Sequence, residues 1–220
     1  MWTQPWHNAL AQPSTTAPPV MFEPPAALTD GRHEVWIAAG GSGEWGGCEV
    51  WASVNDQTYD RIGVIGPGAV VGALVTALPA ADDPDETSEV TVNVAPSEGV
   101  LYPGAPSDAD LFITLCWTDD ELFAYSAATL IGPHAYRLDR HKRRGVFGTP
   151  IKEHAAGARF VRLNTAIFRQ SYPVHLVGHT VYVKLPAFNQ FQNMLEGLDA
   201  IKAYPLVLTG ASGSLTGVQV

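Results

Sequence analysis

Proline and glycine interrupt this chain so often that long regular helices have no room to form. The 220 residues include 17 Pro and 21 Gly, and both residue types weaken or end helices. Residues 90–94 alternate Val with Thr and Asn, which is the period of a strand with one buried face. Helical periodicity is weak, and residues 189–201 are the single candidate helix. The pattern therefore predicts an all-β protein.

The spacing of the apolar segments predicts two consecutive β domains. Five candidate strands fall within roughly sixty residues after residue 33, which is typical of a β-sandwich. A Pro/Gly segment at residues 103–104 then precedes a second set of candidate strands. We expect β-sandwich or barrel-like domains at residues 32–97 and 98–203, followed by a C-terminal tail at residues 204–220.

Residues 1–31 are rich in proline and predict an extended N-terminal arm. An inert spacer would not need large apolar side chains, so we expect those of the arm to lie against another surface, of this chain or of a neighbouring one. These side chains are Trp2, Trp6, Met21 and Phe22.

The charge balance excludes one class of partner. Thirteen Lys and Arg against 22 Asp and Glu give a net charge of −9, opposite to what a nucleic-acid surface needs. The first residues lack the basic and apolar regions of a signal peptide. Cys48 and Cys116 are too few for a disulfide framework and lack CxxC spacing, so free thiols are expected, although one bridge stays possible.

The sequence offers no set of residues that predicts catalysis, a cofactor or a metal. His175 and His179 lie four apart, but no third ligand is evident. The acidic loop at residues 82–86 and the hairpin turn at residues 119–121 are expected to keep their carboxylates hydrated. No nucleophile elbow is present. The sequence therefore predicts a protein without enzymatic activity.

Five of the 13 positive side chains lie within residues 137–144. Such a cluster suits an anion or lipid-headgroup patch, or pairing between subunits with acidic loops such as residues 82–86. Pairing between subunits is the more economical use in an acidic protein. We expect Arg143 and Arg144 to point outward for it.

The Gly-rich segment at residues 40–47 lacks the Lys-Ser/Thr of a phosphate-binding loop, and a strand rather than a helix is expected after it. It predicts a hairpin loop anchored by Trp45.

Four strings together carry a family resemblance: MFEPPAALT at residues 21–29, EVWIAA at 34–39, WGGCEVW at 45–51 and RRGVFGT at 143–149. They resemble the C-terminal region of the tail-tip, or baseplate hub, proteins of long-tailed bacteriophages and gene transfer agents. Members of that family are usually far longer, which implies that this chain corresponds to a fragment or a split gene product.

The resemblance implies a structural virion component, assembled in the host cytoplasm and involved in tail assembly and host attachment. Other phage tail proteins would be its partners, and it would form a homo-oligomer, a trimer about the tail axis. Its expected interface residues are Trp2, Trp6, Met21, Phe22, Arg143 and Arg144.

The alternative is a carbohydrate-binding module that recognises a host-surface glycan. A β-sandwich with tryptophans in its loops is compatible with this function too. Trp45 is then the expected stacking residue, with Trp51 and Trp117 as further candidates.

Overall fold

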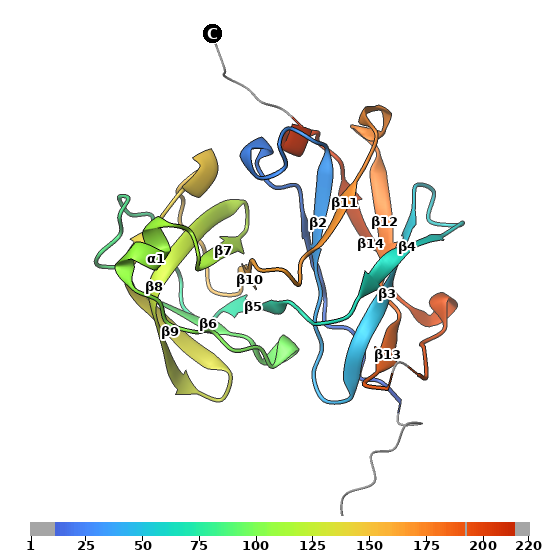
Figure 1. The fold of residues 1–220 in the computed structure, drawn as a ribbon, viewed down its shortest axis with the longest axis horizontal. Coiled ribbons are helices and arrows are strands. Elements are labelled where there is room, and N and C mark those ends of the chain that lie inside the picture. The colour runs from blue at the N-terminus through green and yellow to red at the C-terminus, as the bar shows by residue number, and fades with distance from the viewer. Residues whose placement is uncertain (1–11, 192, 214–220) are drawn as a thin grey trace, which may run out of the picture.

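The computed structural model describes residues 12–191 and 193–213 and consists mainly of antiparallel β structure. Figure 1 shows two β lobes side by side, a barrel and a two-sheet sandwich. The all-β class predicted from the sequence is confirmed.

The barrel is closed by six antiparallel strands in the order β10-β5-β6-β9-β8-β7. Its interior holds Val90, Val92, Phe123, Leu138 and Phe160, all buried. Val90 and Val92 come from the alternating segment, which forms a strand as predicted. The barrel strands are β5 (Val70–Leu74), β6 (Val90–Asn93), β7 (Leu115–Thr118), β8 (Glu121–Gly132), β9 (Ala135–Arg143) and β10 (Arg159–Arg162), with the short helix α1 (Pro106–Asp110) before β7.

The sandwich packs two sheets face to face. One sheet has the order β1-β2-β11, and the other runs β13-β3-β12-β14 with β4 paired to β3. Side chains from both sheets, such as Val35, Ile37, Val50 and Val183, share one buried core. The strands are β1 (Val20–Phe22), β2 (Glu34–Ala38), β3 (Trp45–Ser53), β4 (Asp60–Ile65), β11 (Phe168–Ser171), β12 (Thr180–Lys184), β13 (Ala187–Asn189) and β14 (Tyr204–Val207).

The barrel is inserted into the sequence of the sandwich. The chain leaves the sandwich after β4 and returns to it at β11. A further apolar cluster joins the two lobes, with Phe22 and Trp36 from the sandwich and Trp117 and Val161 from the barrel. The rings of Phe22 and Trp117 stack with centroids 4.8 Å apart. The two lobes therefore share a buried core in addition to two connecting segments.

The insertion changes the predicted organisation. The boundary predicted between residues 97 and 98 falls inside the barrel, because β5 and β6 pair with strands that follow it. Met21 and Phe22 belong to β1, which pairs with β2, and both are buried within this chain. This end of the predicted arm is therefore part of a sheet, which its sequence allows because Val20–Phe22 carries no proline of its own. Trp2 and Trp6 lie outside the described residues.

The helix predicted over residues 189–201 does not form among the described residues of that segment. The side-chain oxygen of Asn189 accepts hydrogen bonds from the backbone N–H groups of Phe191 and Asn193. Such local side-chain bonds compete with the helical pattern. Only a 3₁₀ turn at Leu198–Ala200 follows.

The secondary structure also bears on membranes. The helices within the described ranges are too short or too polar to cross a bilayer.

Candidate interaction surface

Arg144 is the centre of a buried ionic cluster at one end of the barrel. It follows β9, and its side chain is fully inaccessible. Its guanidinium donates five hydrogen bonds, two to Glu121 at 2.6 and 3.0 Å and one each to the carbonyls of Pro79 and Lys152 and to the Asp85 carboxylate. The outward orientation expected for Arg144 was therefore wrong, because every donor of its side chain is used inside the chain.

Glu121 is the main acceptor of this cluster. Its carboxylate also bonds to His154 Nε2 at 2.8 Å and accepts from the backbone N–H groups of Gly145 and Lys152. Burial alone would raise the pKa of Glu121, but the bonds from Arg144 and His154 outweigh it and the pKa lies below its usual range. The expected hydrated position was wrong for this carboxylate, since Glu121 opens β8 and faces inward.

Lys142 and Asp85 complete the ionic cluster, which we define as Asp85, Glu121, Lys142, Arg144 and His154. Lys142 Nζ lies 3.6 Å from Asp85 Oδ2, and both side chains are fully buried. Lys142 also donates to the carbonyls of Ser88 and Arg140, and burial lowers its pKa. Burial would raise the pKa of Asp85, but hydrogen bonds from Ser88 outweigh it and the pKa is lowered. All of these buried charges have partners.

The basic cluster pairs with the acidic loop, but within one chain. Arg143 binds both carboxylate oxygens of Asp83 at 2.8 Å and one of Asp110 at 3.1 Å. The His141 ring bridges Glu86 at 2.5 Å and Asp110 at 2.8 Å. The hydrogen bonds to Asp110 and then Glu86 raise the pKa of His141. The sequence predicted that the basic cluster pairs with the acidic loop. The pairs form within one chain, so a second subunit is not needed to satisfy these charges.

The ionic cluster holds the turn of the RRGVFGT string in place. Arg144 and the N–H of Gly145 are tied to Glu121, and Phe147 then takes a left-handed backbone with φ of 57°. Phe112 has the same φ of 57°, and the centroids of the two rings lie 5.2 Å apart. A left-handed conformation is costly for a bulky residue and persists where the surroundings impose it. Two such residues in contact mark this part of the surface as a candidate for function.

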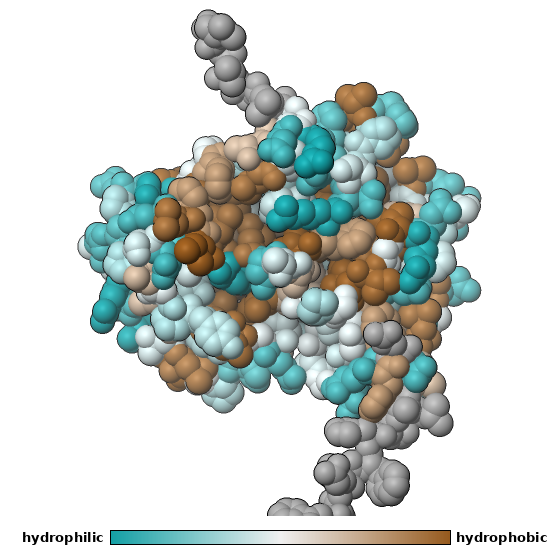
Figure 2. All heavy atoms as spheres, in the orientation of Figure 1, coloured by the Kyte–Doolittle hydropathy of each residue, from teal (hydrophilic) through white to brown (hydrophobic). Residues whose placement is uncertain are grey.

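Exposed apolar side chains surround the two phenylalanines. Leu111 is 70% exposed, Ile113 57% and Ile151 38%. Figure 2 shows apolar side chains gathered over the segment between α1 and β7 and continuing into the depression between the lobes. Contiguous apolar area of this kind marks interaction surfaces in soluble proteins. We call Leu111, Phe112, Ile113, Phe147 and Ile151 the Phe112 surface.

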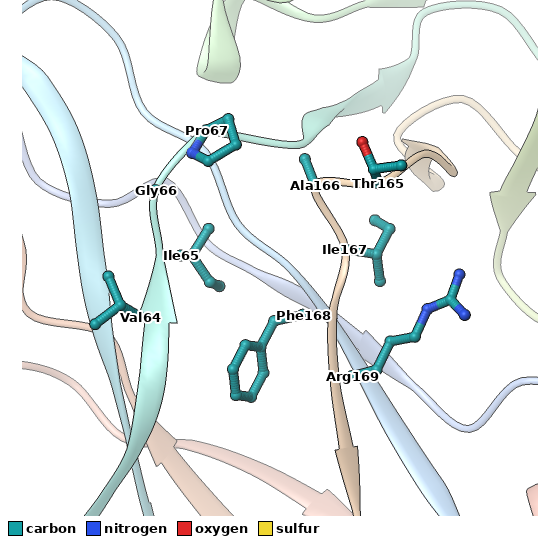
Figure 3. A pocket seen from close by; sticks show the side chains of 9 residues that line it. All are labelled: Val64, Ile65, Gly66, Pro67, Thr165, Ala166, Ile167, Phe168 and Arg169. Carbon is teal, nitrogen blue, oxygen red and sulfur yellow. The ribbon is translucent and has the colours of Figure 1, made fainter.

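A pocket of about 570 Å³ opens between the two segments that connect the lobes. Figure 3 shows Ile65 and Phe168 directed toward each other between these segments, with Pro67 and Ala166 above them and Arg169 at the rim. Most of the lining is apolar. We call this the connection pocket.

Trp45, the expected glycan-stacking residue, is half-buried. Its indole N–H donates to the hydroxyl of Thr16 at 3.0 Å, and its ring packs against the sandwich core. Trp117 is buried between Phe22 and Arg159. Within residues 12–191 and 193–213, Trp36 and Trp117 are buried and Trp45 and Trp51 are half-buried.

Several residues of this region escaped the sequence interpretation. Asp85 and Glu121 were grouped with solvated acidic turns, and Phe112 was not singled out. The sequence did contain a signal for these residues. Two adjacent arginines in an acidic protein need carboxylates close by, and an arginine that is buried needs a carboxylate buried beside it. Among the described residues, no three or more His, Cys, Asp or Glu side chains are arranged to hold a metal ion.

Comparison with known families bears on the barrel. A family model described as "Rcc01698-like, C-terminal" matches residues 69–161, less than half of the chain. The matched range starts one residue before β5 and ends one residue before the end of β10, so it coincides with the inserted barrel. No curated protein matches the chain.

Proposed function

We propose that this chain is a structural component of a bacteriophage tail tip or baseplate hub, assembled in the host cytoplasm and active in the virion, in tail assembly and host attachment. The sequence resemblance supports this proposal. The ionic cluster carries it further, because it locks the RRGVFGT turn into the barrel that the family model matches. The string then acts as a structural signature that presents the Phe112 surface to a neighbour.

The chemistry of the barrel fits a structural role without catalysis. Glu121 and His154 are the kind of acid and base that enzymes use, but both are almost fully buried and bonded to each other and to Arg144. A catalytic pair needs access to substrate. We therefore expect no enzymatic activity from the ionic cluster.

Labelling of tails tests the proposal. An epitope-tagged chain, produced in cells that make the particle, should appear by immunogold microscopy at one end of purified tails. The variant with Leu111→Asp and Ile113→Asp should lose incorporation, because it charges the Phe112 surface. Val54→Asp, at a residue 58% exposed in the sandwich, is the matched control and should incorporate normally. A tagged chain that stays free of tails altogether contradicts the proposal.

Glycan binding is the alternative outcome. It predicts a positive glycan array that Trp45→Ala abolishes. The hydrogen bond of Trp45 to Thr16 and its packing against the core favour an anchoring role for this ring instead.

A further inference from the structure

The tip of the β8–β9 hairpin exposes two large aliphatic side chains in a row. Leu130 is 62% exposed and Ile131 50%, and Val100 nearby is 48% exposed. Figure 1 shows this hairpin reaching the lower edge of the barrel. Leu130 and Ile131 belong to the end of β8, the longest strand of the barrel, and Leu130 pairs with Tyr136 of β9. The hairpin therefore presents an exposed apolar tip that is anchored by strand pairing.

The connection pocket is an apolar hollow on another part of the chain. It is a hollow of about 570 Å³ with Ile65, Pro67, Ala166 and Phe168 among its lining residues. It opens between two connecting segments that the shared core of the lobes holds in place. An apolar hollow and an exposed apolar hairpin tip thus occur on different parts of the same chain.

Charges at the margins of the two features are opposite in sign. Glu98 lines the cavity beside Leu130 and is exposed. Arg169 stands at the rim of the connection pocket, exposed and 4.2 Å from the Trp36 ring centroid. Within the described part of the chain, neither side chain forms an ion pair. Opposite rim charges set the register of an interface more than its strength.

We propose that the β8–β9 tip of one copy docks into the connection pocket of a second copy, with Glu98 facing Arg169. The two surfaces differ, so the contact is heterologous, and repeated rotation closes a ring or extends a filament. This inference deepens the proposed function, because it names the surfaces through which copies would assemble. It can fail while the chain still joins tails through the Phe112 surface.

Sedimentation of the full chain in solution tests the contact, at concentrations up to about 1 mM so that a weak interface is populated. The wild type should associate reversibly. Leu130→Asp should weaken association at least about tenfold, because it buries a charge in an apolar hollow. Thr165→Glu, at an exposed pocket residue, should do the same from the other side. Val54→Asp, at a valine 58% exposed outside both surfaces, is the matched control and should associate like the wild type.

Mixing the two defective variants distinguishes this geometry from a two-fold contact. Leu130→Asp keeps an intact pocket and Thr165→Glu keeps an intact tip, so an equimolar mixture should form heterodimers and nothing larger. In the same way, Glu98→Arg and Arg169→Glu should each weaken association, and the double variant should recover most of the loss.

Three results overturn the inference. They are a wild type that remains monomeric at the highest concentration, a mixture that forms no heterodimer, and a Thr165→Glu variant that associates normally while Leu130→Asp does not. Immunogold labelling of tails by the same variants reports on the proposed function separately. Circular dichroism and thermal unfolding of each variant show whether a loss reflects misfolding.

Discussion

Replacing Arg144 with methionine should destabilise this protein far more than the same change at its neighbour Arg143. The Arg144 guanidinium donates five hydrogen bonds in a fully buried environment, and its loss strands the Glu121 carboxylate with His154 as its remaining side-chain partner. Removing one partner from a buried ion pair costs about 3–5 kcal/mol. For a chain of this size the melting temperature should fall by roughly 6–20 °C.

Arg143 provides the matched control. Its side chain is 29% exposed and its partners Asp83 and Asp110 are exposed as well. Ion pairs of this kind contribute about 1 kcal/mol or less. Urea unfolding followed by tryptophan fluorescence measures both variants, with light scattering to check that association does not differ.

The unpaired Glu121 carboxylate of Arg144→Met can be detected in two further stability measurements. Adding Glu121→Gln to Arg144→Met should recover part of the lost stability, because no carboxylate is left buried without its cation. Lowering the pH should also narrow the gap between wild type and Arg144→Met. In the wild type the pKa of Glu121 is depressed, so its contribution is present above the unfolded value and is lost as the pH falls through the folded pKa. Equal losses for Arg144→Met and Arg143→Met, or a gap that does not change with pH, would refute the reasoning.

Three further predictions concern backbone strain, thiols and a histidine. The free energy of unfolding of Phe147→Gly should exceed that of Phe147→Ala by about 0.5 kcal/mol or more. This reverses the usual order of Gly and Ala, because φ at this position is positive. Burial raises the pKa of both Cys48 and Cys116 to about 12, so neither thiol should react with a disulfide reagent at pH 8 until urea unfolds the chain. The pKa of His141 is raised, so its contribution is complete below its unfolded pKa and is lost as the pH rises through the folded value. The stability advantage of wild type over His141→Gln, measured by urea unfolding, should therefore shrink as the pH rises above the unfolded pKa of about 6.5.

Local pattern predicted part of the strands but not how they pair, and it missed β1, β11, β13 and β14. The alternation at Val90–Asn93 identified its strand correctly, whereas Glu121, expected in a hairpin turn, is the first residue of β8. Which strands share a sheet depends on contacts far apart in the chain, such as β2 with β11, and no local residue pattern encodes these. For this reason the barrel was divided in the wrong place.

The charge pairs of the candidate surface could be predicted from the sequence only in part. The sequence singled out the arginine pair and the acidic loop and matched them as partners, because opposite charges in excess must meet. It could not show that Arg144 is buried while Arg143 is not, since both have identical side chains and adjacent positions. That difference arises from the end of β9, where successive side chains face opposite sides of the barrel wall.

The insertion of the barrel also sets an order of events on the ribosome. Strands β1–β4 emerge first but lack β11–β14, which follow only after all six barrel strands have been made. At about 5–20 residues per second, the roughly forty residues from β11 to β14 take some 2–8 s to appear. During that interval the barrel can close, while the first strands of the sandwich have no complete partner sheet. The barrel is therefore the part of this protein that can form earliest. We expect β1, which contains Phe22, to pack against Trp117 of the barrel first, and β11–β14 to pack afterwards.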